Sequence, residues 1–179
     1  MASDIWLPWL RATELGAASL IRPPDGARYG DGLWTLADSE SAPELIDVYR
    51  SQRAEDGKPD GEIILQALVA WGPDDDAALD GARVWKGAQP PEFYVDDWHD
   101  PAAMYRHGEQ TITDEDFREQ AIIAADPDEH IRRLRHLEKL GATTVAVMNC
   151  SGADIQGSIS VYAELVLPEL RQVNQPAHA

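Results

Sequence analysis

Apolar residues gather in three short runs along this chain, at residues 30–37, 62–71 and 143–148. The third run, Thr-Thr-Val-Ala-Val-Met, is β-branched and apolar with almost no polar interruption. This pattern is typical of a strand buried on both faces by helices, as parallel sheets require. The first two runs also have the length and composition of buried strands. Each run therefore predicts one strand of a parallel sheet.

The segments that follow these runs carry apolar residues at helical spacing. One helix is predicted from Pro43 to about Ala54, and a second over residues 77–85. A third begins after Asp126, which is placed to cap it, and ends at Gly141; Glu129 would complete a capping box. Residues 155–170 return to helical spacing. Alternating strands and helices predict an α/β protein.

Two segments lack a clear period. Residues 1–28 contain apolar side chains that keep no helical or strand spacing for long. Residues 89–116 carry Pro, Asp and aromatic residues with weak periodicity, which predicts an irregular insertion of the kind that forms lids or substrate walls in α/β enzymes. A length of 179 residues predicts a single domain with one sizeable core.

Charge narrows the classes of partner. The formal net charge is −17, from 32 acidic and 15 basic residues, and the only lysines are Lys58, Lys86 and Lys139. An acidic excess of this size repels phosphate backbones and anionic lipid, so it argues against nucleic-acid and membrane-surface partners. Molar salt screens the self-repulsion of such a surface within a few ångströms. The composition therefore predicts a halophilic source.

The location of the protein is predicted from what the sequence lacks. Cys150 is the only cysteine, which excludes an internal disulfide and suits a reducing compartment. Asp4 and Pro8 interrupt the first apolar run, no basic region precedes it, and no stretch approaches the ~18 apolar residues of a membrane span. We expect a soluble, cytoplasmic protein.

Common catalytic motifs are missing: there is no phosphate loop, dinucleotide fingerprint, paired-histidine zinc motif or nucleophile elbow. Residues 74–76, three aspartates, suit a cation cluster or the first turn of a helix, and the helix is favoured. Cys150 has no base beside it in sequence, so an inert thiol is expected. No metal site is predicted, because the histidines lack ligand spacing and each is expected at the surface: His99, His107, His130, His136 and His178.

Five short motifs occur in order along the chain. They are Gly-Asp-Gly-Leu-Trp-Thr at 30–35, Ala-Ala-Asp-Pro-Asp-Glu at 124–129, Leu-Gly-Ala-Thr at 140–143, Ser-Gly-Ala-Asp at 151–154 and Val-Leu-Pro-Glu-Leu-Arg at 166–171. Together they resemble the C-terminal part of the luciferase-like superfamily. Within it they look closest to deazaflavin-dependent oxidoreductases related to glucose-6-phosphate dehydrogenase.

This resemblance implies part of a (β/α)8 TIM barrel, with the three predicted strands as about the sixth, seventh and eighth. The barrel part would cover residues 29–171, after a poorly matching segment 1–28 and before a tail 172–179. The implied activity is hydride transfer between coenzyme F-420, a deazaflavin, or alternatively FMN, and an organic substrate. Such barrels place their sites at the C-terminal ends of the strands. The implied cofactor- or substrate-binding residues are therefore Thr35, Asp38, Ser39, Trp71, Asn149, Ser151 and Gly152.

The resemblance also bears on the substrate. Relatives that oxidise sugar phosphates place basic residues around the phosphate, whereas acidic or neutral residues such as Asp38, Ser39 and Gln120 stand here at the corresponding points. Lys86 and Arg118 are the nearby positive candidates, so a sugar phosphate is not expected. The tryptophans at 34, 71 and 85 suit core packing or ring stacking, and both uses stay open.

Alternatives to an enzyme remain at this point. The chain could be a binding or assembly protein, or a gene remnant, derived from such a barrel. A parallel sheet of three strands would leave backbone groups unpaired at its edges. A homodimer or a partner chain that covers these edges is therefore expected, together with a small-molecule substrate.

Overall fold

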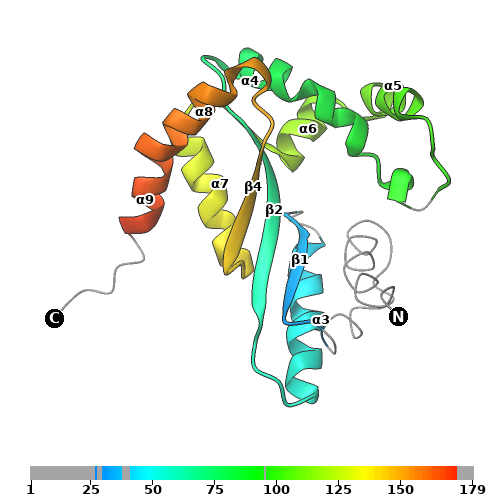
Figure 1. Cartoon of the computed structure of the whole chain (residues 1–179), viewed down its shortest axis with the longest axis vertical. Coiled ribbons are helices and arrows are strands. Elements are labelled where there is room, and N and C mark those ends of the chain that lie inside the picture. The colour runs from blue at the N-terminus through cyan, green and yellow to red at the C-terminus, as the bar shows by residue number, and fades with distance from the viewer. Residues whose placement is uncertain (1–26, 28–29, 38–40, 95, 173–179) are drawn as a thin grey trace, which may run out of the picture. The chain divides into compact units, whose positions relative to one another are not determined.

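The computed structural model describes residues 27, 30–37, 41–94 and 96–172 (Figure 1). They divide into two compact units. The first comprises the described residues up to Ala67 with Pro91–His99 and Leu137–Ala146, and the second comprises Leu68–Pro90, Asp100–His136 and the described residues from Val147 onward. The expected domain bounds, residues 29–171, stay a prediction.

The first unit contains the predicted strand nearest the N-terminus and the first part of the next one. Strand β1 (Gly32–Leu36) pairs in parallel with β2 (Glu62–Ala70), in a register from Gly32 opposite Glu62 to Leu36 opposite Gln66. Helix α3 (Ala42–Glu55) follows β1 and buries an apolar face that includes Leu45, Ile46 and Tyr49. Both strands and this helix confirm the predictions from periodicity.

Strands β2 and β4 (Thr144–Asn149) run through both units. The N–H of Thr143 donates to the carbonyl of Ile63 at 2.9 Å, and the N–H of Cys150 donates to the carbonyl of Val69 at 2.7 Å. Residue numbers rise together along both strands, so the pair is parallel. The predicted α/β class is confirmed.

A fourth strand, β3 (Ile122–Ile123), pairs in parallel with Val69 and Ala70 of β2. The sequence analysis did not predict it, because two residues are too few to show a strand period. Both isoleucines are buried, and Ile123 belongs to a core cluster of the second unit with Ala70, Leu79 and Phe117.

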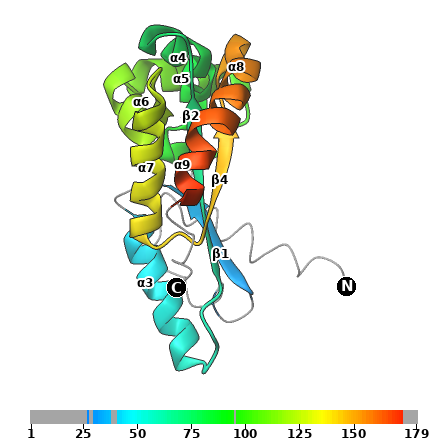
Figure 2. The same ribbon diagram turned by 90° about the vertical axis from the view of Figure 1, so that its left-hand side faces the viewer.

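The helices of the second unit follow the strand ends. Helix α4 (Asp75–Ala82) follows β2 and continues as a 3-10 turn, η1 (Arg83–Ala88). Helix α7 (Pro127–Leu140) follows β3 and, as predicted, begins where Asp126 accepts a hydrogen bond from the N–H of Asp128. After β4 come a 3-10 turn η3 (Gly152–Asp154), helix α8 (Ile155–Val161), a π-helical segment η4 (Tyr162–Val166) and α9 (Leu167–Gln172). Figure 2 shows α8, η4 and α9 as one continuous helical ribbon.

The expectation of an irregular insertion at residues 89–116 was wrong. After a 3-10 turn, η2 (Pro91–Tyr94), this stretch forms helix α5 (Pro101–Thr111), and α6 (Asp114–Gln120) begins inside it. Helix α5 buries only Gly108, so it has no apolar stripe from which a period could be read. The capping signals were nevertheless present: Asp100 caps α5, and Thr113 with Asp116 forms a reciprocal capping box for α6.

The expectation that the third predicted strand is buried on both faces was also wrong. No residue of β4 is buried, and the side chain of Val147 is 42% exposed. Within the described residues β4 pairs with β2 alone, so this sheet does not close and β4 keeps an open side. None of the helices in the described ranges has the length and apolar composition needed to cross a bilayer.

Candidate functional site at the strand ends

The C-terminal ends of β2, β3 and β4 lie in the second unit. In parallel α/β folds the loops beyond these ends carry the binding residues. Trp71 follows β2, Ala124 and Ala125 follow β3, and Ser151 lies two residues beyond the end of β4. The candidate site is built from these loops.

Ser151 joins the loops after β2 and β4. Its side-chain oxygen accepts a hydrogen bond from the N–H of Trp71 at 3.0 Å and donates to Oδ1 of Asn149 at 2.7 Å. The same Asn149 oxygen accepts the N–H of Ser151 at 3.1 Å. Ser151 is 1% exposed, so its hydroxyl is sheltered from water. Three of the predicted site residues are thus brought together by direct hydrogen bonds.

Gly152, a fourth predicted residue, lies beside this network. Its φ of +56° is in the left-handed region, and a Cβ on it would come within 2.7 Å of the Cα of Gly81. A Cβ on Gly81 would meet the carbonyl oxygen of Ser151 at 2.8 Å. Helix α4 therefore packs backbone to backbone against the loop after β4, which holds the Ser151 segment in place.

The indole of Trp71 is fixed at both its nitrogen and its ring. Nε1 donates to the carbonyl of Ala125 at 2.8 Å. A Cβ on Gly157 of α8 would lie 2.7 Å from a ring carbon, so this glycine makes room for the indole. Trp71 as a whole residue is only partly buried, and it lies beside Ser151.

Acidic residues line the start of α4, next to Trp71 in sequence. Asp74 caps the helix by accepting the N–H of Ala77 at 2.8 Å, which confirms the helical interpretation of residues 74–76. Oδ1 of Asp75 accepts the N–H of Ala125 at 2.8 Å, so a carboxylate is fixed on the loop that also holds the Trp71 indole. The edge of the site formed by residues 74–76, which we call the rim, therefore carries negative charge.

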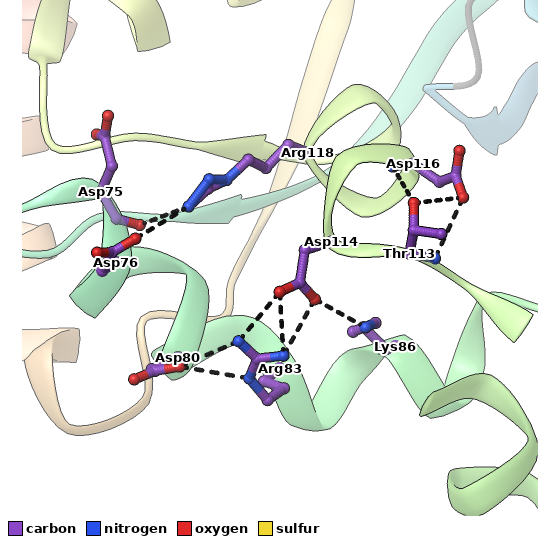
Figure 3. Close-up of polar contacts among 9 residues, drawn as sticks. All are labelled: Asp75, Asp76, Asp80, Arg83, Lys86, Thr113, Asp114, Asp116 and Arg118. Atoms are coloured by element: carbon purple, nitrogen blue, oxygen red, sulfur yellow. Dashed lines mark hydrogen bonds and ion pairs between the residues drawn. The ribbon is translucent and has the colours of Figure 1, made fainter. Parts of the chain in front are cut away.

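The two cations considered near the site are already engaged (Figure 3). Lys86 is buried, and its Nζ lies 2.9 Å from Oδ1 of Asp114, which also accepts from Arg83 at 3.0 Å. The hydrogen bond from Lys86 lowers the pKa of the Asp114 carboxyl, with Arg83 adding to the effect. Arg118 donates to the carbonyl of Asp75 at 3.2 Å and lies 3.7 Å from the Asp76 carboxylate. Both cations therefore connect segments of the second unit through acidic and carbonyl oxygens.

His130 corrects the expectation that each histidine lies at the surface. It is fully buried on α7, with Nε2 at 3.0 Å from the carbonyl of Ala124 and Nδ1 at 2.9 Å from the hydroxyl of Tyr162. It lies four residues before the buried Leu134 and seven before the buried Leu137, so its burial follows from its place on the apolar face of α7. Burial lowers the pKa of His130, which favours the neutral ring.

The remaining predicted residues lie apart from this network or outside the described ranges. Thr35 is buried in β1 of the first unit, opposite Leu65 of β2. Asp38 and Ser39 lie outside the described residues. Cys150 is buried, and burial raises the pKa of its thiol to about 12, which keeps it protonated. Across the described ranges, no three His, Cys, Asp or Glu side chains gather closely enough to hold a metal ion.

Sequence reasoning missed three contributors to the site: Asp75 as an anchor for Ala125, and the buried pair His130 and Tyr162. Their roles depend on partners 50 and 32 positions away, which no local pattern reports. One signal did exist for Tyr162, since it recurs in the apolar spacing of the last helix with Ile159 and Val166.

A parallel sheet with polar residues at its C-terminal strand ends is common to α/β barrels and to doubly wound α/β folds. Sequence comparison is specific: the profile described as luciferase-like monooxygenase matches residues 15–144, and the chain belongs to this family.

Individual relatives agree with this assignment. The chain is 26% identical to the F420-dependent glucose-6-phosphate dehydrogenase of Microbacterium testaceum (strain StLB037), over 88% of this chain and 48% of that protein. The structure of an F420-dependent secondary alcohol dehydrogenase in complex with an F420-acetone adduct is 26% identical with a TM-score of 0.73, over 83% of this chain and 46% of that one. The coenzyme F420-dependent tetrahydromethanopterin reductase from Methanopyrus kandleri shares the fold at 18% identity with a TM-score of 0.58, over 86% and 49%. The chain spans about half the length of the curated relatives it matches.

Proposed function

We propose that this chain supplies the substrate-facing side of an oxidoreductase that transfers a hydride between coenzyme F-420 and a small organic substrate. The observation that carries the proposal is the network of Trp71, Ser151 and Asn149 at the strand ends of a luciferase-like fold. The relatives named as F420-dependent dehydrogenases support the redox class over a purely structural or remnant role. The remaining predicted contacts, Gly152, Thr35, Asp38 and Ser39, are part of the same proposal.

The site suits the ring of a deazaflavin better than its phosphate. Trp71 and Asn149 are both only partly buried, so the indole would stack on a planar ring and the Asn149 amide would hydrogen-bond to it. The bound coenzyme supplies hydride chemistry, and the protein supplies position and polarity. Coenzyme F-420 and FMN both carry a phosphate, yet Lys86, Arg83 and Arg118 are engaged with acidic or carbonyl oxygens. The phosphate is therefore assigned to residues outside this network.

The substrate we propose is a neutral alcohol or carbonyl compound. The rim carries Asp74, Asp75 and Asp76, and the buried cation Lys86 is neutralised by Asp114. A dianionic sugar phosphate would meet repulsion there, because Lys86, Arg83 and Arg118 are engaged with acidic or carbonyl oxygens. The proposed substrate differs from the one in the name of the glucose-6-phosphate dehydrogenase relatives. It is more like the one in the name of the secondary alcohol dehydrogenase.

The assembly we propose covers the open side of β4. Residues 29–171 would act as a partial barrel whose exposed strand is covered by a second copy or by a partner chain that provides the other strands. The exposed Val147 supports this, because a barrel strand is normally shielded by its neighbours. The acidic surface supports a salt-rich cytoplasmic setting.

A coenzyme titration in molar KCl tests the proposal, with coenzyme F-420 fluorescence as the signal and light scattering to give the oligomeric state. We expect saturable binding at micromolar coenzyme, weakened by Trp71→Ala and by Asn149→Ala. The matched control is Trp85→Ala, which removes an indole that is 36% exposed on η1. Absence of saturable binding by the folded chain, or equal weakening by all three variants, would overturn the proposal.

A further inference from the structure

A chain of hydrogen bonds runs through the interior of the second unit toward Trp71. A carbonyl oxygen only accepts, so Nε2 of His130 carries the proton that it donates to Ala124 at 3.0 Å. Nδ1 of the neutral ring then accepts from the Tyr162 hydroxyl at 2.9 Å. His130 is 0% and Tyr162 is 9% exposed. Both ring nitrogens are therefore satisfied away from water.

This series of hydrogen bonds ends on the loop that holds the indole of Trp71. Ala124 is tied to His130 through its carbonyl and to Ala70 of β2 through its N–H, at 3.2 Å. Ala125, the next residue, receives Nε1–H of Trp71 on its carbonyl and donates its N–H to Asp75. The two-residue loop is thus held from α7, β2 and α4 at once, and the Trp71 indole is one of the groups it holds.

We propose that Tyr162 and His130 are positioning residues that fix the Ala124–Ala125 loop and, through it, the indole of Trp71. Burying a hydroxyl and an imidazole costs free energy that an apolar pair of the same size would avoid. What the polar pair adds is direction, because the Ala124 carbonyl fixes the tautomer with the proton on Nε2 and the Tyr162 hydroxyl donates to Nδ1 on the other side of the ring. The π-helical segment supports the assignment, since Tyr162 is its first residue and its carbonyl accepts the N–H of Leu167 five residues on.

The claim that these hydrogen bonds hold Trp71 for a ligand rests on the proposed function. The claim that they fix the loop does not. The positioning role of Tyr162 and His130 is tested without coenzyme, by NMR of the whole 15N-labelled chain in molar KCl. The Trp71 indole resonance is assigned with Trp71→Phe, and its exchange with water is measured in Tyr162→Phe, His130→Leu and His130→Gln. Tyr105→Phe, on a tyrosine that is 40% exposed on α5, is the matched control.

We expect the exchange of the Trp71 indole proton to accelerate by roughly three- to tenfold in Tyr162→Phe and His130→Leu, the range for loss of one hydrogen bond. His130→Gln keeps a donor and an acceptor and is expected to restore the slow exchange, which a packing role alone would not explain. Unchanged exchange in folded His130→Leu, or equal acceleration in Tyr105→Phe, would overturn the positioning role. If the variants show the expected exchange pattern but the wild-type protein binds no coenzyme, the proposed function is contradicted and the positioning role is not.

Discussion

The side-chain oxygen of Ser151 accepts the backbone N–H of Trp71 at 3.0 Å, which links the ends of β2 and β4 across 80 positions of sequence. Ser151 also donates to Asn149, so one hydroxyl serves two partners. A hydroxyl in this position does more than fill space, because a backbone N–H next to a buried strand end needs an acceptor. The strand-end network is therefore part of the stability of the second unit as well as of its site.

Ser151→Ala is expected to destabilise the protein by about 1–3 kcal/mol, because it leaves the Trp71 N–H without its acceptor. The measurement is urea unfolding in molar KCl. Ser160→Ala is the control, since the Ser160 hydroxyl bonds the carbonyl of Gln156 at an exposed position. Equal effects of the two substitutions would contradict the structural role of Ser151.

Gly152→Ala and Gly57→Ala distinguish the cost of a positive φ from the cost of a close approach by another segment. Both residues have positive φ, +56° and +65°, so both substitutions carry backbone strain of about 1 kcal/mol. An added Cβ meets nothing within 4 Å at Gly57 but lies 2.7 Å from Gly81 at Gly152. Unfolding experiments are expected to show a clearly larger loss for Gly152→Ala. A loss no larger than that of Gly57→Ala would mean that the close approach to α4 is relaxed in solution.

Asp114→Asn is expected to cost about 1–3 kcal/mol. It leaves the buried ammonium of Lys86 without an opposite charge, and the cost stays below that of a fully buried pair because the Asp114 side chain is 46% exposed. Asp80→Asn, which removes a 75% exposed partner of Arg83, should cost less than about 0.5 kcal/mol. Thermal unfolding of both variants checks this order, and a reversed order would contradict it.

Acid is expected to destabilise the second unit through His130. The folded-state pKa of His130 is lowered by burial, so below the unfolded value of about 6.5 the unfolded chain binds more protons. The stabilisation is complete above pH 6.5 and is lost as the pH falls toward the lowered pKa. Glu129, Asp126, Arg133 and the Tyr162 hydroxyl are the groups that face the ring.

Urea unfolding between pH 7.5 and 5 measures this effect, with a slope of up to about 1.4 kcal/mol per pH unit from one proton. His130→Gln lacks the titrating ring and should flatten the profile over this range. A wild-type profile that matches that of His130→Gln would contradict the assignment.

Salt is expected to stabilise the protein. A net charge of −17 on 179 residues repels itself, and the screening length falls from about 10 Å at 0.1 M salt to about 3 Å at 1 M. The melting temperature should rise between 0.1 and 2 M KCl and level off above that range. A melting temperature that falls over the same range would contradict a halophilic adaptation.

The sequence by itself determined the elements whose pattern is long enough to read. The apolar runs of β1, β2 and β4 and the helices α3 and α7 were predicted close to their observed bounds. The strands follow from the length and β-branched composition of the runs, and the helices follow from the apolar spacing that burial of one face imposes. The C-terminal strand rule also selected Trp71, Asn149 and Ser151, which the structure joins by hydrogen bonds. The family followed from ordered short motifs and is confirmed by the match at residues 15–144.

Tertiary structure alone decided the rest. Helix α5 escaped prediction because it buries so little, and β3 because two residues carry no period. The burial of His130 and the exposure of β4 depend on which distant segments cover them, and Tyr162, Ala124 and Asp75 are joined by contacts that span tens of residues. Local pattern reports which face of an element avoids water, whereas the partner on that face is chosen only when the chain folds.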